Sequence, residues 1–178
     1  MKTYVTSDLH LGHSGIIKYC NRPFNNVQEM DDFIVSEWNS IVDKNDKVYI
    51  LGDVTFYKDE KATNLVSSLN GNKSLVTGNH DKRNLKYKPF KSCFEQVHNY
   101  YEFYYNNNVI CMFHFPILEW HGAHKGYVHL HGHMHGKSTG LEKFKIKDVG
   151  YDATKKVVLN IDDILEELKT KENKPYGH

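Results

Sequence analysis

Four histidines stand at every second position of the stretch HLHGHMHG, residues 129–136. Alternate side chains of a β-strand share a face, so all four imidazoles could point the same way. Protonated imidazoles would repel one another and neutral ones make a poor core, whereas imidazole is the commonest metal ligand in proteins. The stretch therefore indicates a metal site, with an exposed histidine-rich tract of adventitious metal affinity as the alternative.

The elements around this stretch alternate between strands and helices in the first half of the chain. Apolar spacings and capping residues predict helices at 27–42, at 58–71 (ended by Gly71) and at 161–169 (capped by Asn160 or Asp162). Asn106, Asn107 and Asn108 predict a hairpin, since asparagine tolerates positive φ. The predicted strands are 2–7, 46–53, 73–81, 96–105, 109–116, 143–150 and 155–160, and the stretch 126–136 is predicted to be a strand followed by a loop. This order predicts an α/β layered domain with a mixed sheet.

Residue types that can bind a metal follow the ends of five predicted strands. They are Asp8, His10, Asp53, Asn79, His80, His114, His133 and His135. Ligands of α/β sheets bind at the carboxyl ends of the strands, so we expect these side chains to converge. Each residue alone has a plainer explanation, because an aspartate can belong to a cap or a turn and a histidine to a core or a loop.

Taken in order, the motifs DLH (8–10), GD (52–53), GNHD (78–81), His114 and GHMH (132–135) resemble those of the calcineurin-like metallophosphoesterase superfamily. The superfamily motifs are D-x-H, G-D-x-x-R, G-N-H-[ED], H and G-H-x-H. The resemblance is to small single-domain enzymes of bacterial or phage type and extends from Asp8 to about Asp152. It implies an α/β fold of two packed mixed β-sheets flanked by helices, a four-layer α/β/β/α sandwich. We expect a single domain over 1–170 and a polar, frayed tail over 171–178.

The resemblance also implies two divalent metal ions. The first would be held by Asp8, His10, Asp53 and His135. The second would be held by Asp53, Asn79, His114 and His133. Two cations ~3.5–4 Å apart repel each other, and a shared Asp53 carboxylate would offset that repulsion. Mixed nitrogen and oxygen ligands suit Mn, which we expect, and also Fe, Zn, Ni and Co.

The implied reaction is hydrolysis of a phosphodiester or phosphomonoester by in-line attack of a hydroxide that bridges the two metals. His80 would protonate the leaving oxygen, a proton transfer of the kind that contributes ~10²–10⁴ in rate. Asp81 would orient the His80 imidazole. His131 is expected to support a ligand or the structure, and His129 is not a motif position.

Five further residues are candidates for contact with the substrate: His13, Arg22, Arg83, Trp120 and His124. The sequence departs from the superfamily pattern at Phe56, where an arginine is expected three residues after Asp53. A positive charge near the site is therefore missing, and Arg22 or Arg83 could supply it. The longer GDxVDRG form of the protein Ser/Thr phosphatases is absent, which argues against a phosphoprotein phosphatase.

Composition limits the expected partners and compartment. Lys and Arg number 23 against 22 Asp and Glu, so no net field favours stable binding to nucleic acid or to a membrane. The lysine-rich stretch KRNLKYKPFK, residues 82–91, is interpreted as a solvated loop. No stretch approaches the ~20 apolar residues of a membrane span, and the N-terminus does not resemble a signal peptide. Three cysteines without CxxC spacing are typical of a cytoplasmic protein.

We therefore expect an enzyme that acts on a small phosphorylated substrate, such as a nucleotide. Two alternatives stay open, a nuclease that processes nucleic acid and a non-catalytic scaffold of the same fold that binds a protein partner. The complete ligand set argues against the scaffold. The sequence leaves the oligomeric state open.

Overall fold

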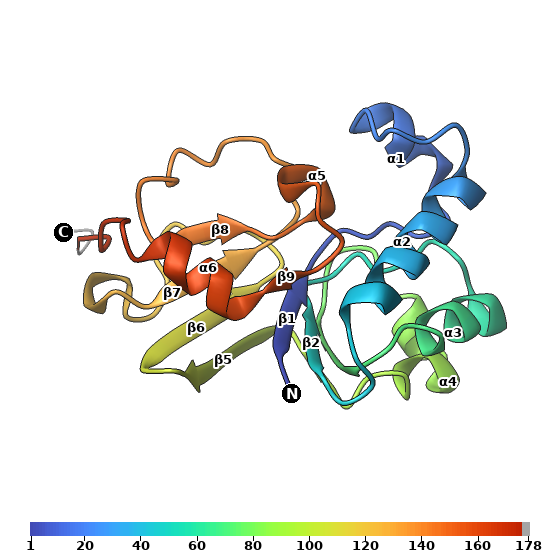
Figure 1. Cartoon of the computed structure of the whole chain (residues 1–178), viewed down its shortest axis with the longest axis horizontal. Coiled ribbons are helices and arrows are strands. Elements are labelled where there is room, and N and C mark those ends of the chain that lie inside the picture. Colours follow the sequence, from blue (N-terminus) through green and yellow to red (C-terminus); the bar gives the residue numbers. More distant parts are fainter. Residues whose placement is uncertain (176–178) are drawn as a thin grey trace.

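The computed structural model of the chain describes residues 1–175 and contains two β-sheets that pack against each other (Figure 1). In this part of the chain the first sheet has five strands, in the order β4-β3-β2-β1-β9. Its parallel strands are β1 (Thr3–Thr6), β2 (Lys47–Ile50), β3 (Asn72–Val76) and β4 (Gln96–His98). β9 (Leu159–Asn160) pairs antiparallel with β1.

The second sheet has the order β5-β6-β7-β8 among the described residues. β5 (Tyr100–Tyr105) and β6 (Asn108–Phe113) form an antiparallel hairpin. β7 (Val128–His131) and β8 (Ile146–Asp148) continue the sheet in parallel. Asn106 and Asn107 have φ of 45° and 63°, so the turn uses the left-handed backbone that asparagine tolerates. The predicted hairpin is confirmed.

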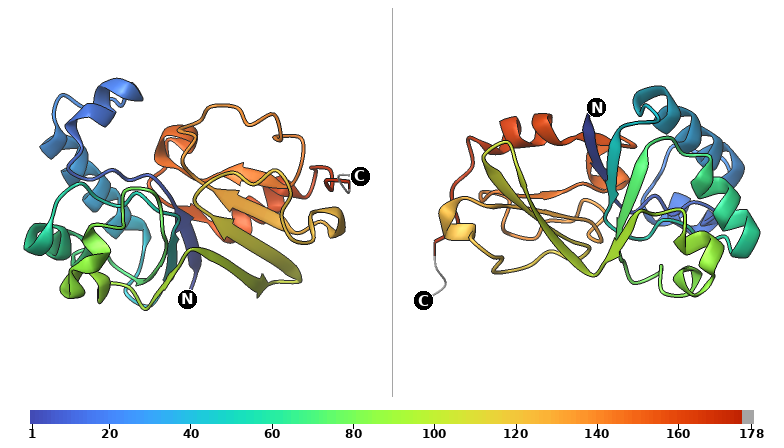
Figure 2. Two further views of the ribbon diagram at one scale, coloured as in Figure 1. Left: turned by 180° about the vertical axis from the view of Figure 1, so that it is seen from behind. Right: turned by 90° about the horizontal axis from the view of Figure 1, so that it is seen from below.

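Helices lie on the outer side of the first sheet, as Figure 2 shows for α2 to α4. The helical elements are α1 (Ser14–Tyr19), α2 (Val27–Ile41), α3 (Asp59–Ser67), η1 (Asn84–Lys86), α4 (Lys88–Lys91), η2 (Ala123–Lys125), α5 (Tyr151–Thr154) and α6 (Ile161–Leu168). Asn160 is the cap of α6, because its side chain accepts a 2.8 Å hydrogen bond from the Asp162 N–H. Gly71 does not cap α3, whose C-cap is Ser68.

Two apolar clusters hold these layers together, because alternate residues of a strand face opposite sides. Residues of one face pack with buried residues of α2 and α3; they are Tyr4, Val48, Ile50 and Leu75. Their neighbours face the second sheet and α6; they are Val5, Tyr49, Leu51 and Val76. β1 is buried at every position, and β2 and β3 at every position but the first, as expected for strands covered on both faces. The two mixed sheets with flanking helices confirm the predicted α/β sandwich.

The predicted strand 96–105 is instead two strands in different sheets. β4 pairs with β3 in the first sheet and β5 pairs with β6 in the second, so the chain crosses between sheets at Asn99. The crossing is fixed by Thr77, whose N–H donates to the His98 carbonyl and whose hydroxyl donates to the Asn99 side chain, each at 2.8 Å.

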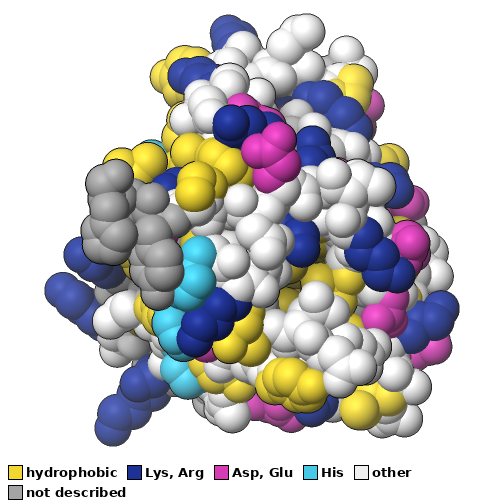
Figure 3. Space-filling view, turned by 90° about the vertical axis from the view of Figure 1, so that its left-hand side faces the viewer, with side chains coloured by type: hydrophobic (Ala, Val, Ile, Leu, Met, Phe, Trp, Pro, Cys, Tyr) yellow, Lys and Arg dark blue, Asp and Glu magenta, His cyan; other side chains and the backbone are white. Residues whose placement is uncertain are grey.

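Part of the predicted tail contacts the domain. Glu172 N–H donates to the Lys143 carbonyl at 3.0 Å, and Lys174 forms an ion pair with Glu119. Residues 176–178 of the predicted tail lie outside the described residues. Lysine, acidic and apolar side chains are interspersed on the face that carries this end of the chain (Figure 3). Within residues 1–175, no helix has the length and apolarity needed to cross a bilayer.

Candidate metal centre

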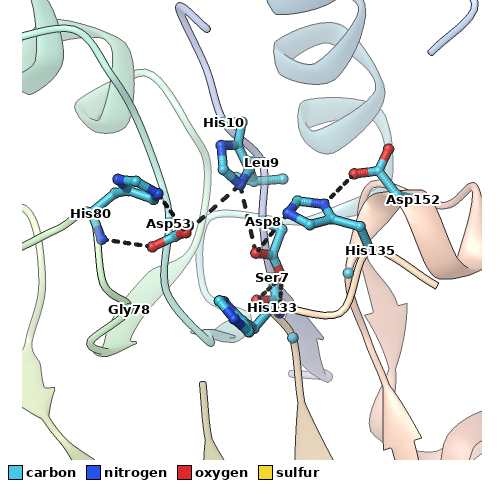
Figure 4. A network of polar contacts seen from close by, with 12 residues as sticks. Ser7, Asp8, Leu9, His10, Asp53, Gly78, His80, His133, His135 and Asp152 are labelled. Atoms are coloured by element: carbon cyan, nitrogen blue, oxygen red, sulfur yellow. Dashed lines mark hydrogen bonds and ion pairs between the residues drawn. The ribbon is translucent and has the colours of Figure 1, made fainter. Parts of the chain in front are cut away.

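The loops after five strands bring their polar side chains to one place, as the position of the Asp53 carboxylate demonstrates (Figure 4). Asp53 Oδ2 lies 3.7 Å from His10 Nε2 and 3.7 Å from His114 Nε2. The same oxygen lies 3.8 Å from His80 Nε2. This oxygen is thus surrounded by imidazole nitrogens from three different loops. The Asp53 side chain is only 2% exposed.

Asp8 stands on the other side of His10. Its Oδ1 lies 3.6 Å from His10 Nε2 and 3.9 Å from His135 Nε2. Burial would raise the pKa of the Asp8 carboxyl, but the His10 imidazole and the Ser7 hydroxyl outweigh burial and hold the pKa below its usual value. The carboxylate is therefore anionic at neutral pH.

Several of these buried atoms have no hydrogen-bond partner among residues 1–175. Asp8 Oδ1 and both ring nitrogens of His10 are among them. An unpartnered buried carboxylate oxygen beside an unpartnered imidazole nitrogen is costly unless something binds both. A divalent cation satisfies both lone pairs, so these residues fit a metal ion.

His114 is fixed in the tautomer that a metal requires. Its Nδ1 lies 2.7 Å from the Leu51 carbonyl and donates to it, which leaves the Nε2 lone pair exposed to the site. Asn79 Oδ1 lies 2.9 Å from that Nε2. Two electron-pair donors then face each other, as they do around a cation.

His135 is oriented by an acidic partner that sequence reasoning missed. Its Nδ1 lies 2.7 Å from Asp152 Oδ2, and this hydrogen bond raises the His135 pKa. Arg22 holds the same carboxylate with two hydrogen bonds of 2.8 Å. A carboxylate on the outer nitrogen of a metal-binding histidine fixes its tautomer and strengthens it as a ligand. The available signal was an aspartate two residues after the predicted strand 143–150.

Five candidate ligands have a left-handed backbone. The φ values are 55° at Asp8, 53° at His10, 54° at Asp53, 68° at His133 and 49° at His135. Such conformations cost about 1–3 kcal/mol each in non-glycine residues, and they concentrate at functional sites. Hydrogen bonds between loops hold some of them in place: His10 N–H donates to the Asp53 carbonyl at 3.0 Å and His133 N–H to Asp8 Oδ2 at 2.8 Å.

Two glycines allow the loops to approach this closely. A Cβ on Gly132 would lie 1.9 Å from Ser7 Oγ and 2.2 Å from Asp8 Oδ2. A Cβ on Gly78 would lie 2.3 Å from Asp53 Oδ1. The glycines of the GHMH and GNHD motifs are therefore required by packing against the ligand carboxylates.

His80 is the exposed histidine of the group, with 47% of its side chain accessible. Its backbone N–H donates to Asp53 Oδ1 at 3.0 Å, which anchors the residue beside the carboxylate.

Asp81 has a different role from the predicted one. Its carboxylate accepts hydrogen bonds from the N–H groups of Asp53, Val54 and Gly78, at 2.8–3.1 Å. Within residues 1–175 no hydrogen bond joins Asp81 to the His80 imidazole. Asp81 is instead a buried brace between the loops after β2 and β3, because both of its oxygens are used by backbone donors. Burial raises its pKa, against the effect of these bonds.

Three of the five candidates for substrate contact are not positioned to touch a substrate. Arg22 is 3% exposed and its guanidinium is occupied by Asp152 and by backbone carbonyls, so it supports the site from within. Trp120 is 3% exposed and donates to the Tyr127 carbonyl. His124 lies in η2, whose Gly122 and Gly126 caps bound a short turn outside the ligand loops.

The other two candidates, His13 and Arg83, lie at the site. The His13 ring stacks on Phe56 with centroids 4.1 Å apart and lies 5.6 Å from the His10 ring. Burial, and the neighbouring His10 and His80, lower the His13 pKa. Arg83 is exposed and lines a cavity beside His80.

The four alternate histidines do not share one face. β7 ends at His131, and the left-handed residues that follow turn His133 and His135 out of the strand. His129 and His131 are buried in β7, with their Nδ1 atoms hydrogen-bonded to backbone carbonyls.

Comparison with known families agrees with this geometry. The sequence profile of the family described as "Calcineurin-like phosphoesterase" matches residues 1–177. The chain belongs to the calcineurin-like phosphoesterase family. It is therefore a phosphoesterase, a hydrolase of a family that typically binds divalent metals, and it has Asp and His clusters able to hold them.

Relatives and a solved structure extend the likeness. An uncharacterized protein, MJ1445, from Methanocaldococcus jannaschii is 37% identical over 136 residues, which are 75% of this chain and 69% of that protein. The gene 66 protein of Mycobacterium phage L5 is 38% identical over 82 residues, 44% of this chain and 39% of that protein. The crystal structure of AQ665, a protein of unknown function from Aquifex aeolicus, has a TM-score of 0.74 at 21% identity. The match covers 93% of this chain and 98% of the AQ665 chain, and it supports the fold.

Proposed function

We propose that the protein hydrolyses a phosphodiester or phosphomonoester bond of a small phosphorylated substrate at a centre of two divalent metal ions, Mn before Fe, Zn, Ni or Co. The observation that carries this proposal is the place of Asp53 Oδ2, 3.7 Å from His10 Nε2 and 3.7 Å from His114 Nε2. An anionic oxygen between imidazoles from two loops is suited to bridge two cations.

The proposed ligands form two sets that share Asp53. The first set is Asp8, His10, Asp53 and His135, and the second is Asp53, Asn79, His114 and His133. Metal ions bound there would neutralise phosphoryl oxygens and lower the pKa of a water molecule so that it attacks near neutral pH. The chain lowers the pKa of the Asp8 carboxyl and turns the ring nitrogens of His114 and His135 toward the site. The His114 ring is oriented by its hydrogen bond to the Leu51 carbonyl, and the His135 ring by its hydrogen bond to Asp152. The His133 backbone N–H donates to Asp8.

His80 is proposed as the general acid. As the water oxygen forms its bond to phosphorus, the bond to the leaving oxygen breaks, and the His80 imidazole gives that oxygen a proton. Its exposed ring, 3.8 Å from Asp53 Oδ2, supports this role because it is both near the ligand carboxylate and open to the substrate.

We also propose the cytoplasm as the compartment and a nucleotide-like compound as the substrate. Cys20, Cys93 and Cys111 are all free thiols, which suits a reducing environment. The balance of 23 basic and 22 acidic residues favours a small substrate over stable nucleic-acid binding.

Hydrolysis of bis-p-nitrophenyl phosphate by the pure protein with Mn²⁺ or Ni²⁺ tests the proposal. We expect metal-dependent release of p-nitrophenol, lost after chelation and regained with Mn²⁺. A protein that binds metal and hydrolyses neither this diester nor p-nitrophenyl phosphate would contradict the proposal and favour the scaffold. Degradation of DNA in preference to both esters would favour the nuclease.

A further inference from the structure

A cavity of about 350 Å³ lies directly beside the candidate general acid. Asn79 and His80 form part of its lining, and Phe56 forms another part. The cavity is thus continuous with the place where the leaving group of a bound ester would lie.

Three cations line the same cavity: Lys58, Lys82 and Arg83. All three are exposed, and no ion pair within residues 1–175 joins any of them to an acidic side chain. The lining contains no Asp or Glu among the described residues. Asp81 precedes Lys82 in sequence but is 1% exposed and bonded to backbone N–H groups, so it does not offset their charge.

Phe56 lines the same cavity and lies beside two histidines of the candidate metal centre. Its ring centroid lies 4.8 Å from that of His80 and 5.4 Å from that of His10. An apolar ring stands where the superfamily pattern has an arginine, so the positive charge of this chain lies farther out, on the cavity wall. A phosphate held by the metal ions and an anion held in the cavity would therefore be two separate groups of one substrate. Phe56 would contact the atoms that join them.

We propose that this cavity binds a second anionic group of the substrate, a phosphate or a carboxylate, next to the ester that is hydrolysed. The inference rests on the proposed function and deepens it: the substrate class is a small phosphoester that carries another anion beyond the leaving oxygen. Lys82 and Arg83 supply the charge from one wall and Lys58 from another. Only part of the basic stretch 82–91 takes part, because Lys86 and Lys88 do not line the cavity.

Two matched series of substrates test the subsite. Each is an alkyl phosphate monoester whose chain of two to six carbons leaves with the oxygen, ending in a phosphate in one series and in a hydroxyl in the other. The release of inorganic phosphate is measured per ester bond. For the Mn²⁺-loaded protein we expect the terminal phosphate to raise kcat/KM at least fivefold at one or more chain lengths. The gain should shrink as salt is added, since exposed charges are screened. A phosphate series no better than the hydroxyl series at every chain length overturns the proposal.

Variants separate the subsite from other effects of charge. In Lys82→Gln/Arg83→Gln the ratio of the two series should fall to about one, whereas the control Lys86→Gln/Lys88→Gln should keep the wild-type ratio. Persistence of the ratio in the first variant, or its loss in the control, contradicts the assignment.

A binding measurement distinguishes failure of the subsite from failure of the proposed function. Calorimetry of butane-1,4-bisphosphonate against butylphosphonate uses no turnover, because a C–P bond replaces each ester bond. Tighter binding of the bisphosphonate that depends on Lys82 and Arg83 supports the subsite even if no ester is hydrolysed, in which case the proposed function alone fails. Equal binding of the two compounds by the wild-type protein, together with equal kcat/KM, overturns the subsite alone.

Discussion

Asp152 Oδ2 lies 2.7 Å from His135 Nδ1, while the same carboxylate receives two hydrogen bonds of 2.8 Å from the Arg22 guanidinium. Arg22 and Asp152 are 130 residues apart in sequence and both are buried. The pair therefore joins the segment after α1 to α5 and, at the same time, directs the other nitrogen of His135 toward Asp8.

Asp152→Asn should weaken metal binding about 10–100-fold, because the histidine loses the anion that orients it and strengthens it as a ligand. It should also destabilise the protein by about 3 kcal/mol or more, since Arg22 is left buried without its counter-ion. Titration with Mn²⁺, at a temperature where circular dichroism shows the variant folded, measures the affinity. Asp148→Asn is the control, because Asp148 accepts from Gly136 and Gly150 N–H groups and should affect stability only. Equal affinities in both variants would argue against an orienting role.

His80→Ala should leave metal occupancy nearly unchanged, since His80 is beside the ligands and is not one of them. Hydrolysis of alkyl phosphate esters, whose leaving groups need a proton, should slow at least tens-fold. Hydrolysis of p-nitrophenyl esters should slow less, because p-nitrophenolate is already a stable anion. Equal slowing of both would mean that His80 acts by charge on the phosphoryl oxygens, and no slowing of either would refute the proposed acid.

Stability should fall between pH 6.5 and about 4 through His129. Its Nδ1 donates to the Cys111 carbonyl and its Nε2 accepts the Ile117 N–H at 3.1 Å, so the fold requires the neutral ring. Burial lowers its pKa from 6.5 to about 4. The unfolded chain therefore binds a proton first as pH falls, and the stabilisation present above pH 6.5 is lost progressively, by up to about 3 kcal/mol near pH 4.

Urea denaturation of the wild type and of His129→Gln at pH 7.5, 5.5 and 4.5 checks this. The variant should be less stable at pH 7.5 and should lose less stability on acidification, since it lacks the titrating group. Parallel pH profiles would assign the acid sensitivity to other groups.

The convergence of the candidate ligands could be predicted from the sequence because their residue types and spacing are local. DLH and GNHD follow parallel strands of the first sheet, so Asp8 and Asn79 had to lie at the same edge, whereas GHMH follows β7 of the second sheet and its approach depends on how the two sheets pack. The hairpin at Asn106 was equally local. The sandwich followed from the resemblance that these motifs carry.

What the sequence did not reveal depends on contacts over long distances. Asp152 acquires its role from Arg22, and nothing near either residue signals the pair. The crossing at Asn99 depends on hydrogen bonds from Thr77, which follows β3. The stretch 96–105 by itself has the pattern of a single strand. Asp81 next to His80 suggested a partner, yet backbone N–H groups of the loop after β2 and of its own loop occupy both of its oxygens.

Asp53→Ala should abolish binding of both metals, because it removes the one carboxylate shared by the two proposed ligand sets. Elemental analysis of the variant should find far less metal per chain than in the wild type. Two metals retained per chain would contradict the bridging role.

Crystals of the wild-type protein grown with Mn²⁺ test the centre most directly, by an anomalous difference map at the manganese absorption edge. We expect two peaks about 3.5–4 Å apart, one on either side of Asp53 Oδ2, with His10 and His135 beside one and His114 and His133 beside the other. A single peak, or two peaks that do not share Asp53, would contradict a dinuclear centre.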